Sequence, residues 1–248
     1  MTLAIFDLDE TLIAADSCSL FCEYMVAEGI VDESFVKRDL EQMALYKAGQ
    51  LDLIAYIDFF IGELSHLTTA QIDELLPKFI DTYIQPAIYP QAQTLLGMMR
   101  ERDVRPLIIS ATAAFIVKPI ASAFGISDYL AIELEEENQK YTGRIAGIPS
   151  FREGKVERLK IWLQAQGESL EGASFYSDSI NDQPLLEFVD HPVATNPDQA
   201  LTELAVKNSW PVLRWYLNDE NAEQSVLQTE PTNPNIDQHF TNAEQTHV

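Results

Sequence analysis

Short apolar runs alternate with segments of helical periodicity along most of this chain, and this alternation limits the fold more than any other feature. Strands connected through helices form a parallel sheet, and right-handed crossovers place the helices on both of its faces. The sequence therefore predicts an α/β fold. After a first strand at 3–6, the pattern predicts a helix at 91–103, a strand at 105–110, a helix at 114–125, extended segments at 129–137 and 140–147, a helix at 154–167, a strand at 173–178, a helix at 183–189, a strand at 191–196 and a helix at 198–208.

The segment that follows the first strand is different. Apolar residues at helical spacing predict a bundle of about four helices there, at 19–29, 32–49, 51–64 and 68–84. Asp32 and Thr68 are candidate N-caps, and Gly29 is a candidate C-cap.

These patterns divide the chain into three parts. A catalytic core is expected at 1–14 and 87–217, with an all-helical insertion at 15–86. A third part, 218–248, holds six acidic residues, no Lys or Arg and few large apolar side chains. Such a segment buries too little apolar surface to offset its ordering entropy, so we expect a disordered tail.

The charge of the chain excludes several partners. Its 39 acidic and 16 basic residues give a net charge of −23, which repels nucleic acids and anionic membranes. No apolar run is long enough to span a bilayer, and the N-terminus lacks the basic region of a signal peptide. Cys18 and Cys22 are expected to be free thiols, as in a reducing cytoplasm. A monomer or a homodimer is expected.

Three predicted strands end on polar residues. Because ligands bind beyond the carboxyl ends of parallel strands, the side chains there are expected to meet in one crevice. Lys155, near the start of a helix, can supply a cation to this group, which consists of Asp7, Asp9, Ser110, Asp178 and Asp182. Several carboxylates in one pocket need a counter-ion, and oxygen ligands favour Mg²⁺. A carboxylate beside a bound phosphate can attack phosphorus and form an aspartyl phosphate.

Together these residues resemble a known family. The sequence DLDET at 7–11, Ser110 at a strand end, Lys155, and the Asp178–Asp182 segment are similar to the four motifs of the haloacid dehalogenase (HAD) superfamily. The resemblance covers about residues 2–217. It implies a Rossmann-like parallel-sheet core, a helical cap formed by 15–86, and a Mg²⁺-dependent phosphatase that acts on a small phosphorylated metabolite.

The resemblance also implies catalytic roles. Asp7 would be the nucleophile, and Asp9 would protonate the leaving oxygen and then activate water. Ser110 and the backbone N–H of Ala111 would hold the phosphoryl oxygens. Lys155 would neutralise charge on Asp7 and the phosphate.

The metal would be held by a second group of residues. Asp178 and Asp7 would be ligands, together with the backbone carbonyl of Asp9. Thr11, Asn181 and Asp182 would support these ligands from behind, with Asp182 holding either the water shell of the metal or Lys155.

Details of the motifs favour one substrate over another. The cap position resembles the subfamily of phosphoserine phosphatases and HAD-type histidinol-phosphate phosphatases. The chain departs from the phosphoserine phosphatases at three places. Those enzymes have glycines at the positions of Ala111-Thr112 and on both sides of the position of Asp178. They also have Glu at the position of Asp16. The cap sequence AGQLDLIAYIDF is more similar to the histidinol-phosphate phosphatases of proteobacteria. Histidinol phosphate, an intermediate of amino-acid biosynthesis, is therefore the favoured substrate, and phosphoserine is the alternative.

Other interpretations remain open at this point. Asp16 either pairs with a substrate ammonium or is the N-cap of a helix that begins at Ser17, and Arg152 is either a substrate contact or a surface residue. A phosphotransferase of the same family, or a catalytically silent binding module, would carry the same fold.

Overall fold

The apolar run Leu3–Phe6 forms β1, which lies inside a six-stranded parallel sheet of order β3-β2-β1-β6-β7-β8. A computed structural model describes residues 2–218 of the chain. Its strands are β1 (Leu3–Phe6), β2 (Arg105–Ala113), β3 (Asp128–Ile132), β4 (Leu134–Glu137), β5 (Lys140–Ile145), β6 (Ser174–Ser177), β7 (His191–Thr195) and β8 (Val212–Leu213). Its helical elements are α1 (Ser17–Ala27), α2 (Ser34–Lys47), α3 (Leu53–Leu64), α4 (Thr69–Phe79), η1 (Ile80–Ile84), η2 (Gln85–Ala87), α5 (Pro90–Glu101), α6 (Ala114–Ala123), α7 (Glu153–Gln166), η3 (Ile180–Asp182), α8 (Gln183–Leu186) and α9 (Gln199–Asn208).

Both faces of the sheet are covered by helices. Successive side chains of a strand point to opposite faces. In β1, Leu3 and Ile5 pack with α7, α8 and α9, whereas Ala4 and Phe6 pack with α5 and α6. The predicted α/β class with a Rossmann-like parallel sheet is confirmed.

The edges of the sheet differ from the prediction. Strand β2 continues past Ser110 to Ala113, and its register with β3 shifts between Ile109 and Ala113. The extended segment at 129–137 is divided between β3, in the sheet, and β4, which pairs with β5 in a separate antiparallel hairpin. The short edge strand β8 was not predicted from the sequence, because two residues carry no periodicity.

The inserted segment folds into the helices α1 to α4, as expected. Thr68 caps α4 through a capping box with Gln71. The N-cap of α2 is Glu33 rather than Asp32, whose carboxylate instead accepts the backbone N–H of Ser34 at 2.9 Å. Gly29 follows α1 in the left-handed conformation (φ +69°) that glycine adopts without strain.

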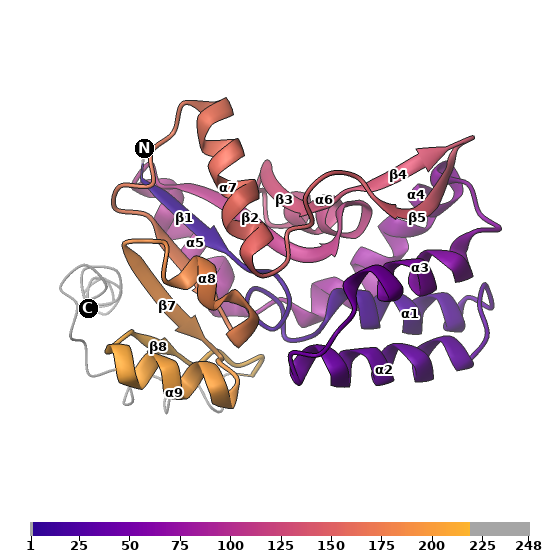
Figure 1. Ribbon diagram of the computed structural model, residues 1–248, viewed down its shortest axis with the longest axis horizontal. Coiled ribbons are helices and arrows are strands. Elements are labelled where there is room, and N and C mark those ends of the chain that lie inside the picture. Colours follow the sequence, from indigo (N-terminus) through magenta and orange to yellow (C-terminus); the bar gives the residue numbers. More distant parts are fainter. Residues whose placement is uncertain (1, 219–248) are drawn as a thin grey trace, which may run out of the picture.

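The β4–β5 hairpin lies against the inserted helices rather than against the sheet (Figure 1). The backbone N–H of Thr69 donates to the carbonyl of Gln139 at 2.8 Å, and Lys140 Nζ donates to the carbonyl of Ser65 at 2.8 Å. One hydrophobic cluster runs from α1, α3 and α4 to α5 and α6 beside the sheet. The helices therefore share a core with one face of the sheet.

Two further predictions concern membrane-spanning helices and the state of the cysteines. No helix within residues 2–218 has both the length and the apolar character needed to cross a membrane. Cys18 and Cys22 are free and buried. The predicted tail from residue 219 onward lies outside the described residues.

Two glycines provide a test of how closely the hairpin packs on α3. Gly143 and Gly147 both have a positive φ, +78° and +74°. A Cβ atom on Gly143 would lie 3.3 Å from Oδ1 of Asp58, whereas one on Gly147 would have no described atom within 4 Å. Gly147→Ala should therefore lose only the roughly 1–2 kcal/mol of a strained backbone. Gly143→Ala should lose more, because the Asp58 side chain, which has the α3 backbone behind it, must shift to make space for the Cβ atom. Urea denaturation of both variants measures the difference, and equal losses would contradict close packing.

Candidate active site

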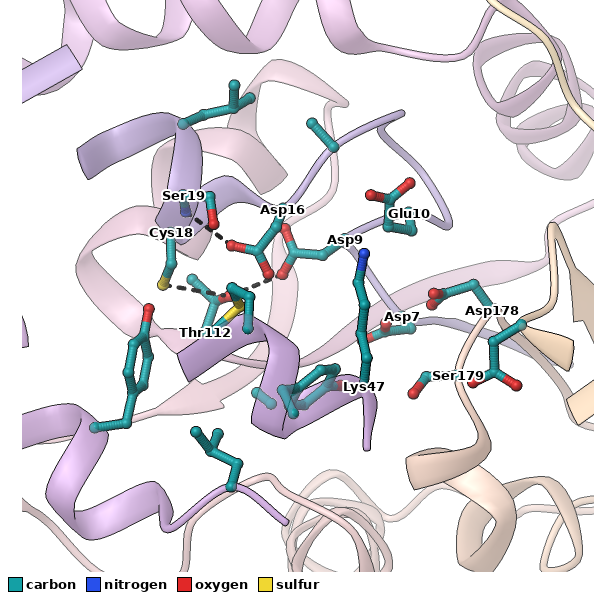
Figure 2. Close-up of a pocket in the computed structure, with 18 of the residues that line it drawn as sticks. Asp7, Asp9, Glu10, Asp16, Cys18, Ser19, Lys47, Thr112, Asp178 and Ser179 are labelled. Atoms are coloured by element: carbon teal, nitrogen blue, oxygen red, sulfur yellow. Dashed lines mark hydrogen bonds between the residues drawn. The ribbon is translucent and has the colours of Figure 1, made fainter. Parts of the chain in front are cut away.

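The carboxyl ends of β1 and β6 bring Asp7 and Asp178 to one edge of the sheet, and the backbone N–H of Asp7 donates to the carbonyl of Tyr176 at 2.9 Å. A cavity of about 590 Å³ lies between this edge and helices α1 to α3. Side chains from both sides line it (Figure 2). The lining residues are Asp7, Asp9, Glu10, Ala14, Ala15, Asp16, Cys18, Ser19, Leu20, Glu23, Leu40, Met43, Tyr46, Lys47, Leu51, Leu53, Tyr56, Ala111, Thr112, Phe151, Asp178, Ser179, Asn196 and Asp198.

The predicted site residues fall into two groups. Those that line the cavity are Asp7, Asp9, Asp16, Ala111 and Asp178. The remaining ones do not line it. Thr11, Arg152, Lys155, Asn181 and Asp182 form hydrogen bonds with the first group or with each other, and Ser110 precedes Ala111 in β2 and accepts the backbone N–H of Thr112.

Lys155 is the centre of the buried part of the site. Its Nζ lies 2.8 Å from Oδ1 of Asp7 and 2.7 Å from Oδ1 of Asp182, and its exposed fraction is 1%. Burial opposes a charged lysine, but the two carboxylates outweigh it and raise the pKa of Lys155 above its ordinary value. Lys155 therefore stays a cation and holds Asp7 in a fixed position.

The positive charge of Lys155 does not balance the negative charges around Asp7. Burial raises its pKa to about 7, Lys155 acts in the opposite direction, and the charges of Asp182 and Asp9 raise it further. A single ammonium thus faces several carboxylates, so the site has room for another cation.

Asp9 is held by two donors. The backbone N–H of Ser17 donates to its Oδ1 at 2.7 Å. The hydroxyl of Thr112 donates to its Oδ2 at 2.8 Å, as Figure 2 shows. Burial raises the pKa of Asp9, which favours the protonated form that a general acid needs. Thr112 was not predicted to be a site residue from the sequence. A hydroxyl residue in this place was the signal that could have found its contact with Asp9.

Asp178 faces the same end of the cavity. Thr11 Oγ1 donates to its Oδ1 at 3.2 Å. Burial raises the pKa of Asp178 well above its usual range, and the charges of Asp7 and Asp182 add to this effect.

The donors at this end suit a hard cation. No three His, Cys, Asp or Glu side chains within the described ranges form a metal-binding group. Mg²⁺, however, is commonly bound through one or two carboxylates with water and phosphate oxygens. The carboxylates of Asp7 and Asp178 and the carbonyl of Asp9 fit that requirement, and a divalent cation would offset the excess of negative charge.

Ser110 and Ala111 lie at the bend of β2. The Ser110 hydroxyl oxygen accepts the backbone N–H of Thr112 at 3.0 Å, and its carbonyl accepts the hydroxyl of Ser150 at 2.5 Å. Ser110 is fully buried and Ala111 lines the cavity. Ala111 thus lies within the register shift of β2 and borders the cavity.

Asp16 is the helix N-cap that one of its two sequence interpretations predicted, and its pairing with a substrate ammonium stays a prediction. It is the N-cap of α1 and accepts the backbone N–H of Ser19 at 2.8 Å, and it also lines the cavity. Burial raises its pKa to about 8, with further contributions from Asp9 and Asp39.

Arg152 and Asn181 connect the sheet side of the site to the inserted helices. Arg152 donates to the carbonyl of Gly49 at 2.6 Å and to Oδ1 of Asn181 at 3.2 Å, and Asn181 donates to the carbonyl of Tyr46 at 3.2 Å. Arg152 is not among the lining residues. The structure therefore places its guanidinium in contact with both halves of the site, and its role as a substrate contact stays a prediction.

Residues of α2 and α3 complete the lining, and the sequence analysis did not single them out. Tyr46 and Lys47, at the end of α2, face the carboxylates of the sheet edge, and the ammonium group of Lys47 points toward Glu10 (Figure 2). Among the described residues that line the cavity, Lys47 is the only Lys or Arg. Helical periodicity marks these residues as helix-forming, but it does not show which of them face a ligand.

Comparisons with known proteins agree with this site. The family model described as haloacid dehalogenase-like hydrolase matches residues 4–187. A histidinol-phosphatase from Neisseria meningitidis serogroup C is 38% identical over 218 residues, which is 86% of this chain and 98% of that protein.

Solved structures agree as well. A protein of unknown function from Bordetella pertussis Tohama I, 35% identical, superposes with a TM-score of 0.79 over 86% of this chain and 98% of its own. A phosphoserine phosphatase in a phospho-aspartyl intermediate analogue form has the same fold, with a TM-score of 0.63 at 17% identity over 82% of this chain and 90% of its own. The chain therefore belongs to the haloacid dehalogenase-like hydrolase family, and it is a phosphatase of that family.

Proposed function

We propose that this protein is a Mg²⁺-dependent phosphomonoesterase that works through an aspartyl phosphate on Asp7 and acts on a small amine-bearing phosphate ester, with histidinol phosphate as the favoured substrate. The observation that carries the proposal is the buried ion pair of Lys155 with Asp7, directly below a cavity that Asp9 and Asp16 also line.

The chemistry follows from the positions of the carboxylates. An oxygen of Asp7 attacks the phosphorus atom, and the bond between phosphorus and the alcohol oxygen breaks as that oxygen takes the proton of Asp9. Asp9 then accepts a proton from water, whose oxygen attacks phosphorus and releases phosphate and free Asp7. Lys155 holds Asp7 in place for both steps, and the backbone N–H of Ala111, a residue that lines the cavity, would donate to the phosphoryl oxygens.

The metal would be bound at the same edge. Asp7 and Asp178 would hold it through their carboxylates, and Asp9 through its carbonyl. When bound, Mg²⁺ would neutralise the charge of the phosphoryl group. Asp182 and Thr11 hold Lys155 and Asp178 in place from behind.

Asp16 and the apolar side chains that line the cavity support an amine-bearing substrate. Asp16 is a partly buried carboxylate in the cavity with no lysine or arginine partner recorded among the described ion pairs. Leu40, Met43, Leu51 and Leu53 supply apolar surface around the same space. The similarity to a histidinol-phosphatase over nearly the full length of that protein favours histidinol phosphate over phosphoserine.

Asp7→Asn should abolish turnover and leave the protein folded. The amide is a poor nucleophile, whereas Lys155 keeps its ion pair with Asp182. We expect phosphate release to fall by about 10³-fold or more, equivalent to roughly 4 kcal/mol of barrier. A colorimetric phosphate assay and a thermal melt test this, and a variant that keeps a tenth of the activity would exclude Asp7 as the nucleophile.

Removal of divalent cations should stop the reaction. We expect EDTA to abolish phosphate release and added Mg²⁺ to restore it. Independently of activity, Mg²⁺ should raise the melting temperature of the wild-type protein, because a ligand that binds only the folded state stabilises it. Asp178→Asn should reduce that shift, whereas Asp81→Asn, at an exposed position in η1, should keep it. An unchanged shift in Asp178→Asn would contradict its role.

Asp16→Asn separates the charge of this residue from its helix cap. Asparagine caps helices about as well as aspartate, so α1 should keep its stability. The loss of charge should raise KM for histidinol phosphate by about tenfold and leave KM for 4-nitrophenyl phosphate within roughly twofold. The matched control is Asp52→Asn, because Asp52 caps α3 in the same way but does not line the cavity. Equal KM values in both variants would remove Asp16 from substrate binding.

A further inference from the structure

Behind the lining of the cavity lies a buried carboxylate that the proposed reaction does not use. Asp39, in α2, has an exposed fraction of 1%. Its Oδ2 accepts the hydroxyl of Ser19 at 2.5 Å, and its Oδ1 accepts the hydroxyl of Tyr56 at 2.8 Å. The thiol of Cys22 is a third hydrogen-bond partner. Ser19 and Tyr56 belong to the lining, so Asp39 acts on the cavity through them.

These contacts fix the direction of the hydrogen bonds. A hydroxyl group has one proton to donate and two lone pairs that accept. Because Ser19 and Tyr56 both give their proton to Asp39, each can only accept a hydrogen bond from a molecule in the cavity.

The neighbouring groups have the same character. Asp16 offers carboxylate oxygens, and the backbone N–H of Ser19 already donates to it. The thiol of Cys18 donates to Thr112 at 3.8 Å and so is also engaged (Figure 2). Lys47, on α2, points toward Glu10 (Figure 2). Within the described part of the chain, the hydroxyls of Ser19 and Tyr56 thus present acceptors to the cavity.

The charge of this end agrees with the hydrogen-bond pattern. Burial, Asp9 and Asp39 together raise the pKa of Asp16 to about 8. An ammonium group beside Asp16 would lower this pKa and ionise the carboxyl, whereas a carboxylate would raise it further. Burial also raises the pKa of Asp39, and the bonds from Ser19 and Tyr56 act in the opposite direction and favour its ionised form.

We propose that Asp39 is a positioning residue that turns the hydroxyls of Ser19 and Tyr56 into acceptors, so that the site takes phosphate esters of amino alcohols and rejects esters whose alcohol half carries a carboxylate. This inference rests on the proposed function and specifies its substrate class. An ammonium or imidazolium group supplies the donors that this surface needs. A carboxylate beside Ser19 and Tyr56 would face two acceptors, and a buried acceptor without a donor costs free energy.

Asp39→Asn tests the inference because it keeps the shape of the side chain and changes its hydrogen bonding. The amide accepts one hydroxyl proton and donates to the other hydroxyl oxygen, whose proton must then turn elsewhere, toward the cavity. We expect the ratio of kcat/KM for L-histidinol phosphate to that for L-phosphoserine to fall about tenfold, or about 1.4 kcal/mol. The change should lie mainly in KM, and 4-nitrophenyl phosphate should react as with the wild-type enzyme. Asp58→Asn, at an exposed position of α3, is the control for charge.

Tyr56→Phe keeps the test decisive if Asp39→Asn does not fold. This variant removes one acceptor and leaves Asp39 in place, so KM for L-histidinol phosphate should rise and the same ratio should fall. Tyr24→Phe is its matched control, because Tyr24 is also buried and donates to the carbonyl of Leu75, outside the lining.

The outcomes separate the inference from the proposed function. A wild-type enzyme that hydrolyses 4-nitrophenyl phosphate but not L-histidinol phosphate overturns the proposed substrate and the inference with it. A wild-type preference for L-histidinol phosphate that is unchanged in both Asp39→Asn and Tyr56→Phe overturns the inference alone. A ratio that falls in these variants and not in the controls supports it.

Discussion

The site depends on a single buried ammonium group. Lys155 comes from the first turns of α7, yet its Nζ lies between carboxylates that follow β1 and β6, and it is almost completely shielded from water. A buried charge is tolerated only where partners compensate it. The requirement is mutual: Asp7 and Asp182 could not lie so close together without the lysine. The order of the central strands and the placement of α7 on one face of the sheet are what make this contact available.

The sequence predicted this part of the structure well because its signals are local. An apolar run that stops at Asp7, or a helix that begins near Lys155, can be recognised within a few residues, and the parallel sheet then brings the ends together. The cap end of the cavity could not be predicted in the same way. Asp39 and Tyr56 lie on different helices, and their bond depends on how α2 and α3 pack. Arg152 shows the same limit, since its partner at Gly49 is 103 residues away.

The two ends of the cavity therefore have different physical origins. At the end beside the sheet, the charged side chains follow strand termini, and the geometry of the backbone fixes their positions. The cap end uses side chains on helices, where a hydroxyl can face a buried carboxylate on one side and a ligand on the other. Under the proposed function, changes in the second group would alter which alcohol is accepted without disturbing the groups that handle phosphorus. This separation is consistent with one fold serving relatives that carry different phosphatase names.

Arg152 and Asn181 reach the end of α2 through the carbonyl oxygens of Gly49 and Tyr46, not through their side chains. A carbonyl oxygen is present whatever residue occupies the position. The hydrogen bond from Asn181 therefore does not depend on the side chain of Tyr46, although that side chain lines the cavity, whereas Gly49 has a φ of +68° that favours glycine. A substitution of Tyr46 can change the lining of the cavity and still leave the carbonyl oxygen that joins α2 to the sheet side of the site.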